Sequence, residues 1–101
     1  MNPQYQVVYP ESVRKTVRDL LQRATELGIR DQIVAALRTI DDRLKSSPLD
    51  YGDVNNELER LTTYVRVQAP LFLRYAVSSF LHEDKHLVFI STIGALSGRG
   101  L

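Results

Sequence analysis

The sequence predicts a single α+β domain, with a short N-terminal strand, an antiparallel hairpin of two helices and a three-stranded antiparallel meander, the helices lying on one face of the sheet. Two observations predict this class. Apolar residues recur every three to four positions in the first half of the chain, and three runs in the second half alternate between apolar and polar residues. The chain has 101 residues, 44% hydrophobic and 25% charged, as is typical of one globular domain.

The first strand and the first helix follow from the start of the sequence. Residues 5–9, YQVVY, are rich in Val and Tyr and favour a short strand that ends at Pro10. Pro10 and Glu11 suit the first turn of a helix, because proline fits there and a carboxylate favours the positive helix end. Apolar residues then form one stripe over 13–27, and Gly28 is a typical residue just beyond a helix C-terminus.

A second helix is expected from about Asp31, with its apolar stripe over 33–44. The short connection between the helices predicts an antiparallel hairpin. Neither helix can bury its stripe completely against the other, so a sheet must cover them. Residues 46–60 contain Pro, Gly, Asp and Asn and predict a loop, which is either a functional segment or a plain crossing from helix to sheet.

Three strands are expected after this loop, over 61–68, 71–80 and 86–93. Residues 69–70 supply the first turn and the polar residues 82–85 the second, so the three strands form an antiparallel meander. The N-terminal strand has no neighbour in sequence with which to form a hairpin. We therefore expect it to join the meander across the two helices.

Alternation also predicts which strand residues face the helices. In the strand 71–80 the core side is expected to hold Leu71, Leu73, Tyr75 and Val77. Arg74 then lies with Phe72 on the opposite, open face. In the strand 61–68 the polar side is expected to hold Tyr64, Arg66 and Gln68. We expect Arg66 and Arg74 to share the open face.

Composition excludes several kinds of site. The sequence has no cysteine, which excludes disulfides, thiolate zinc sites and cysteine nucleophiles. No signal peptide and no membrane span are expected, which predicts a cytoplasmic protein without a membrane partner. The net charge is +1, but residues 61–101 hold four Lys/Arg and two Asp/Glu and are the better candidates to meet an anion. A single domain is expected over 1–101, with a loose tail over about 95–101.

The chain resembles the RelE/ParE superfamily of bacterial toxins over nearly its whole length. The resemblance lies in the order and character of YQVVYPESV, two helical stretches, SSPLDYGD, YVRVQAPLFLRYAV and HLVFISTIGAL. It implies the toxin of a type II toxin–antitoxin pair, held inactive by an antitoxin that folds on binding. RelE-like members cut mRNA on the ribosome without metal or cofactor, whereas ParE-like members poison DNA gyrase.

The resemblance also implies site residues. Metal-free RNA cleavage needs a base, an acid and fixed cations around the phosphorane. The catalytic candidates in this sequence are Arg66, Arg74, Arg99 and His86, and the RNA-binding candidates are Tyr64, Arg66, Arg74 and Lys85. The family's third-strand arginine aligns with Phe72, and Arg74 stands two residues further along the same face, about 6–7 Å away.

Two classes of function remain open at this point. One is a ribosome-dependent endoribonuclease with a displaced set of cations. The other is a non-enzymatic protein-binding module of the same fold, either a gyrase inhibitor or an inactive toxin homologue. Arg66 and Arg74 also fit plain surface residues whose stems cover apolar surface. His82 and His86 fit either a two-histidine metal site or a solvated turn, and the turn is preferred, so no metal is expected.

Overall fold

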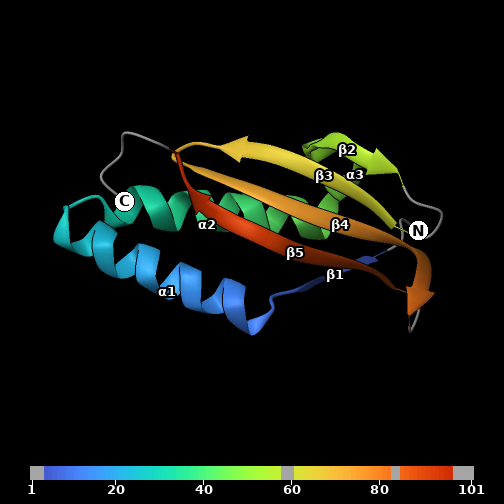
Figure 1. Cartoon of the computed structure of the whole chain (residues 1–101), viewed down its shortest axis with the longest axis horizontal. Coiled ribbons are helices and arrows are strands. Elements are labelled where there is room, and N and C mark those ends of the chain that lie inside the picture. The colour runs from blue at the N-terminus through green and yellow to red at the C-terminus, as the bar shows by residue number, and fades with distance from the viewer. Residues whose placement is uncertain (1–3, 58–60, 83–84, 97–101) are drawn as a thin grey trace.

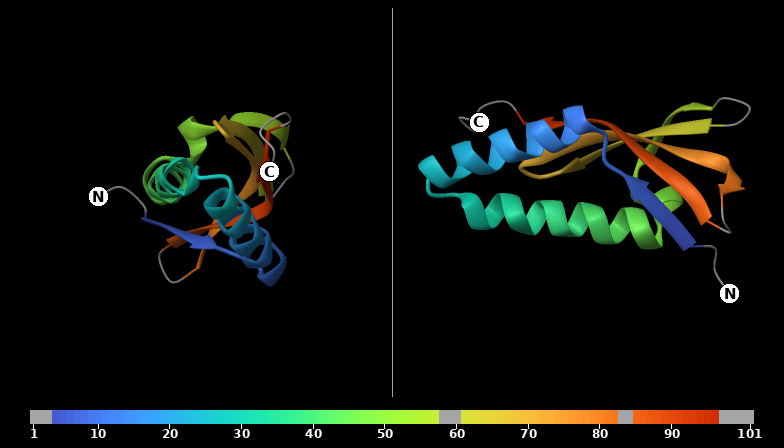
Figure 2. Two further views of the ribbon diagram at one scale, coloured as in Figure 1. Left: turned by 90° about the vertical axis from the view of Figure 1, so that its left-hand side faces the viewer. Right: turned by 90° about the horizontal axis from the view of Figure 1, so that it is seen from below.

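The computed structural model arranges the chain in two layers, with two long helices against one face of a five-stranded sheet (Figure 1). The structure describes residues 4–57, 61–82 and 85–96. The view from below in Figure 2 shows both helices on the same side of the strands. The predicted α+β class and the order of strand, helix, helix and antiparallel strands are therefore confirmed.

The elements follow one another along the described chain with short connections. They are β1 (Gln4–Val8), α1 (Glu11–Glu26), α2 (Arg30–Ser46), α3 (Pro48–Tyr51), β2 (Asp53–Glu57), β3 (Leu61–Gln68), β4 (Leu71–His82) and β5 (Lys85–Ala95). The sheet has the strand order β1-β5-β4-β3-β2. β1 runs parallel to β5, and all other neighbours are antiparallel. As expected, the first strand joins the meander after the two helices.

Each long helix forms because it has one apolar face to bury. The buried residues are Val13, Leu20 and Ala24 in α1 and Ile33, Ala36, Ile40 and Leu44 in α2. Gly28 ends α1 with a φ of 73°, a left-handed conformation that glycine adopts without strain. The Ile29 amide then donates to the Ala24 carbonyl at 2.8 Å and closes the helix end.

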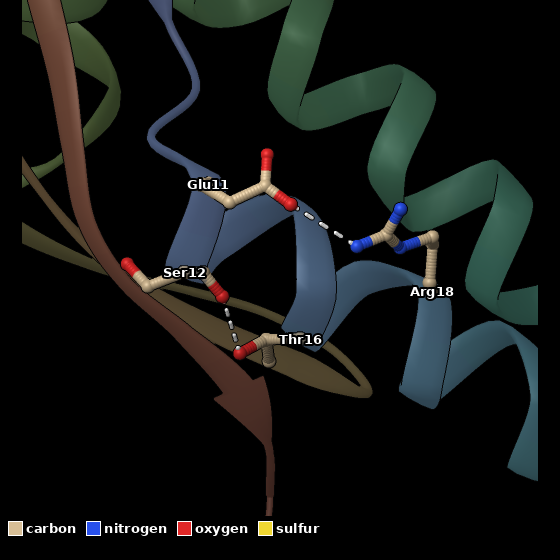
Figure 3. Close-up of polar contacts among 4 residues, drawn as sticks. All are labelled: Glu11, Ser12, Thr16 and Arg18. Atoms are coloured by element: carbon tan, nitrogen blue, oxygen red, sulfur yellow. Dashed lines mark hydrogen bonds and ion pairs between the residues drawn. The ribbon is translucent and has the colours of Figure 1, made fainter.

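Polar side chains in the first half of α1 form contacts within the helix (Figure 3). The Thr16 hydroxyl donates to the Ser12 carbonyl at 3.0 Å, and the Arg18 guanidinium lies 3.3 Å from the Glu11 carboxylate. Both charged side chains are largely exposed, and such ion pairs contribute roughly 0–1 kcal/mol. The apolar face of α1 therefore holds the helix in place, while its polar face meets water.

The predicted loop over 46–60 is wrong for most of its length. The helix α3 begins at Pro48, whose fixed φ suits a first helical turn, and the strand β2 then pairs with β3. All five residues of β2 are exposed, so the strand carries no apolar alternation and is held by its backbone ladder. This edge strand raises the sheet from the expected four strands to five.

The expected loose tail is also partly wrong. Ala95 ends β5, and the Leu96 amide donates to the Pro70 carbonyl at 2.9 Å, next to the turn between β3 and β4. These two residues are therefore held by the sheet. Residues 97–101 lie outside the part of the chain that the structure describes.

Three tyrosines join α3 to the sheet. The Tyr75 and Tyr64 rings are stacked with centroids 5.1 Å apart, and Tyr51 stacks on Tyr75 at 6.4 Å. The Tyr75 hydroxyl donates to the Pro48 carbonyl at 2.5 Å. Gly52 allows this close approach, because a Cβ there would stand 2.6 Å from the Tyr75 hydroxyl. Tyr75 is thus a core residue, as its alternation predicts.

Candidate functional site

Arg74 lies on the sheet face that the helices do not cover. Its neighbours on β4, Leu73 and Tyr75, are 1% and 0% exposed and point towards the helices. Successive side chains of a strand point to opposite faces, so Arg74 points the other way, and it is exposed. This position agrees with the one predicted from alternation.

A hollow of about 390 Å³ surrounds Arg74 on this open face. Its lining residues are Asp53, Val65, Arg66, Val67, Phe72, Leu73 and Arg74. Val67 is 57% exposed, which is unusual for so apolar a side chain. The Phe72 ring lies across β5, because a Cβ at Gly94 would stand 2.9 Å from it. Arg74 therefore has mainly apolar neighbours in this hollow, together with Arg66 and Asp53.

Arg66 does not share the open face with Arg74, so that prediction is wrong. In the ladder between β3 and β4, Arg66 is opposite Leu73 and Val65 is opposite Arg74. Residues directly opposite each other in an antiparallel pair lie on the same face. Arg66 therefore projects from the helix-covered face, at its uncovered margin beside α2 and α3.

The guanidinium of Arg66 lies over an aromatic ring from α3. Its Cζ is 4.8 Å from the centroid of the Tyr51 ring, within the range of a cation–π contact. The Tyr51 hydroxyl donates to Oε1 of Gln68 at 2.8 Å. Burial raises the pKa of the Tyr51 phenol, although the charges of Arg66 and Arg43 act in the opposite direction. Arg66 is thus part of a second, polar site.

Tyr64 is buried, which corrects its prediction as an RNA-stacking residue on the polar side of the strand. It is 6% exposed and packs against Tyr75 in the core. Burial is the main reason why the pKa of its phenol is raised. A base cannot stack on a ring whose face is already covered by another ring, so Tyr64 supports the fold instead.

His86 and Arg74 are far apart, and they lie on different faces because a bulge in β5, between the partners of Arg74 and Tyr75, shifts its alternation by one residue. His86 is opposite Tyr5, their rings stack at 5.8 Å, and its Nδ1 lies 2.9 Å from the Ser78 carbonyl. Arg74 is opposite Thr92, six residues along β5 from His86, or about 20 Å. His86 therefore cannot act as a base on a group bound at Arg74.

Lys85 and Arg99 do not join this site either. Lys85 begins β5 and pairs with Gln4 and His82, at the end of the sheet remote from Arg74. Arg99 lies outside the described residues. Within those residues, no group of three or more His, Asp or Glu side chains could hold a metal ion. The side chain of His82 also lies outside the part of the chain that the structure describes, and so does the predicted pair of His82 and His86.

The open face has the chemistry of a binding surface. Its hollow combines Arg74, the aromatic ring of Phe72, the half-buried Val65 and the exposed Val67, with Arg66 and the carboxylate of Asp53 also in the lining. Arginine and aromatic side chains are enriched among residues that dominate the free energy of protein binding. Among the described residues around Arg74, no lysine, histidine or tyrosine is placed to exchange a proton with a bound RNA.

Sequence reasoning did not assign to a site several residues that the structure places in the lining of a hollow. Among them are Arg43 on α2, Tyr51 on α3, Asp53 on β2 and Gln68 on β3. The sequence predicted only that Arg43 belongs to the second helix and that Tyr51 belongs to the loop over 46–60. Gln68 could have been found, because the two-residue turn over 69–70 pairs Gln68 with Leu71 and so fixes its face.

Comparison of the chain with protein-family models, with curated proteins and with solved structures found no match. The fold and the hollow around Arg74 are therefore the basis for proposing a class of function. None of the helices in the described part of the chain is both long and apolar enough to cross a membrane.

Proposed function

We propose that this chain is the toxin of a type II toxin–antitoxin pair, of the RelE/ParE kind, and that it acts by binding a protein target. Two features support the assignment. The order of one strand, two helices and a closing antiparallel meander is the order that the resemblance implies. β1 also pairs with the last strand, so the termini of the fold meet in the sheet.

The single observation that carries the binding mode is that Arg66 and Arg74 project from opposite faces of the sheet. Arg66, the cation expected beside Arg74, is opposite Leu73 and so lies on the other face. Metal-free cleavage of RNA needs a base, an acid and several cations around one phosphate. Arg74 beside Phe72, Val65 and Val67 instead suits a protein surface that offers an acidic residue beside an apolar one.

The antitoxin is the second partner under this proposal. A partly disordered, acidic chain that folds on binding would cover the apolar side chains of the open face and pair with Arg74. Its removal would free the same surface for the target. The resemblance to ParE-like toxins makes DNA gyrase the first target to test. This function places the protein in the bacterial cytoplasm.

The test is induced expression in a bacterium. The wild-type protein is expected to stop growth, and Phe72→Ala and Arg74→Ala are expected to relieve the arrest, because each removes part of the proposed contact. Arg38→Ala is the matched control, since Arg38 is an exposed arginine on α2. Each variant is checked for folding by circular dichroism.

Two outcomes separate the alternatives. Growth that is unaffected by the wild-type protein would contradict any toxin. Growth arrest accompanied by cleaved mRNA, mapped by sequencing of 5′ ends, would replace protein binding with the endoribonuclease function. Arrest with intact mRNA supports the binder, and a gyrase supercoiling assay with purified protein then tests the target.

A further inference from the structure

A second hollow, which we call the polar pocket, lies between α2, α3 and β3, on the margin of the helix-covered face. Its volume is about 350 Å³, and its lining residues are Thr39, Arg43, Asp50, Tyr51, Arg66 and Gln68. Every one of these side chains carries a polar group. Three separate elements supply them, so the pocket exists only in the folded chain.

Two arginines converge on the polar pocket from different elements. Arg66 reaches it from β3 and is held over the Tyr51 ring, with its Cζ 4.8 Å from the centroid. Arg43 reaches it from the last turn of α2. The ion pairs found among the described residues are Arg18–Glu11 and Lys45–Asp41, so neither guanidinium is neutralised by a carboxylate there.

Gln68 adds a third donor. The Tyr51 hydroxyl donates to Oε1 of Gln68 at 2.8 Å, which leaves the amide NH₂ group of Gln68 to donate into the pocket. The Thr39 hydroxyl is not available as a donor, because it already donates to the Ala35 carbonyl at 3.1 Å. Asp50 is the one carboxylate of the lining. It is exposed, and its negative charge weakens the binding of an anion.

We propose that the polar pocket binds a phosphate group through the guanidinium groups of Arg43 and Arg66 and the amide of Gln68. Guanidinium groups form forked, charge-assisted hydrogen bonds that match the oxygens of a phosphate. Stacking of a nucleobase is excluded from the proposal, because Arg66 and Tyr75 already contact the Tyr51 ring. The pocket therefore recognises the phosphate itself, either as the free ion or within an RNA strand.

The test is a titration of the purified protein with inorganic phosphate, followed by NMR chemical shifts, with chloride at equal ionic strength as the reference. Saturable shifts in Arg43, Arg66 and Gln68 are expected. Arg43→Ala and Arg66→Ala should each weaken binding about tenfold or more, because each removes a charge-assisted bond. Asp50→Asn should tighten binding, and Arg38→Ala, on the same helix as Arg43, should leave it unchanged.

Further variants and a second ligand distinguish the alternatives. Arg66→Lys keeps the positive charge but loses the forked hydrogen bonds of the guanidinium group, so it should still weaken phosphate binding. This variant separates the effect of charge from that of hydrogen-bond geometry. A short single-stranded RNA that competes with phosphate and needs both arginines would identify RNA as the source. Absence of saturable binding, or equal weakening by Arg38→Ala and Arg43→Ala, would overturn the proposal. Neither result depends on whether the protein is a toxin.

Discussion

At the residue scale, the buried hydroxyl of Tyr75 is the polar group on which the packing of α3 depends. Tyr75→Phe leaves the Pro48 carbonyl without its hydrogen-bond donor and should lower the free energy of unfolding by about 1–2 kcal/mol. Urea denaturation followed by circular dichroism measures the change.

The matched control for this change is Tyr51→Phe. The Tyr51 hydroxyl donates to the half-buried side chain of Gln68, which can form a hydrogen bond with water instead. A smaller loss of the free energy of unfolding is therefore expected. A loss for Tyr51→Phe as large as that for Tyr75→Phe would contradict the special role of the buried bond to Pro48.

The faces of β4 could be predicted from its residues, but those of β3 could not be predicted from alternation alone. Leu71, Leu73 and Tyr75 mark one side of β4 clearly, whereas β3 has Thr63, Val65 and Val67 on one side and Tyr64, Arg66 and Gln68 on the other. Both of those sides are mixed. The register decides between them, because Tyr64 stands opposite Tyr75 and so enters the core.

At the element scale, β1 is tied to α2 by a short polar chain. The Tyr9 hydroxyl, just beyond β1, donates to Oδ1 of Asp41, and Lys45 Nζ lies 2.7 Å from Oδ2 of the same carboxylate. Burial and the bond to Asp41 raise the pKa of the Tyr9 phenol. Burial alone would raise the pKa of Asp41, but the hydrogen bonds from Lys45 and Tyr9 outweigh it and lower that pKa.

This polar chain predicts a pH dependence of stability. A carboxyl whose pKa is lower in the folded state stabilises the fold above its unfolded pKa, and that stabilisation is lost as pH falls through the folded pKa. Asp41→Asn should therefore lower the free energy of unfolding at pH 7, and the difference from wild type should shrink below about pH 4.

The measurement is urea unfolding of both proteins from neutral to acid pH. Asp42→Asn is the control, because Asp42 is exposed and adjacent in sequence. If the difference in the free energy of unfolding between Asp41→Asn and wild type stayed constant as the pH fell, the ionised Asp41 carboxylate would not be its source.

The edge strand β2 shows why part of this fold is hidden in the sequence. Its residues, DVNNE, have neither apolar alternation nor a high strand propensity. They become a strand because α3 brings the chain to the free edge of β3, where the backbone can complete a ladder. Such a strand depends on tertiary contacts. The position of Asp53 in the hollow around Arg74 therefore could not be predicted from the sequence.

At the scale of the whole molecule, the hollow around Arg74 and the polar pocket lie on opposite faces of the sheet and share only the strand β3. The hollow around Arg74 opens on the face without helices, and the polar pocket opens beside α2 and α3. Arg66 contributes to the lining of both, but the β3–β4 register places it on the face of the polar pocket. The two surfaces can therefore bind different partners at the same time.

This separation predicts that the two effects can be removed independently. Arg74→Ala should relieve growth arrest and leave phosphate binding unchanged, because Arg74 lies on the open face. Arg43→Ala should abolish most phosphate binding and leave growth arrest unchanged, because α2 does not reach that face. Growth assays and phosphate titrations of the same two variants provide the comparison. If Arg43→Ala also relieved the arrest without unfolding the protein, the phosphate site would be part of the toxic function, and the division of the molecule into two independent faces would fail.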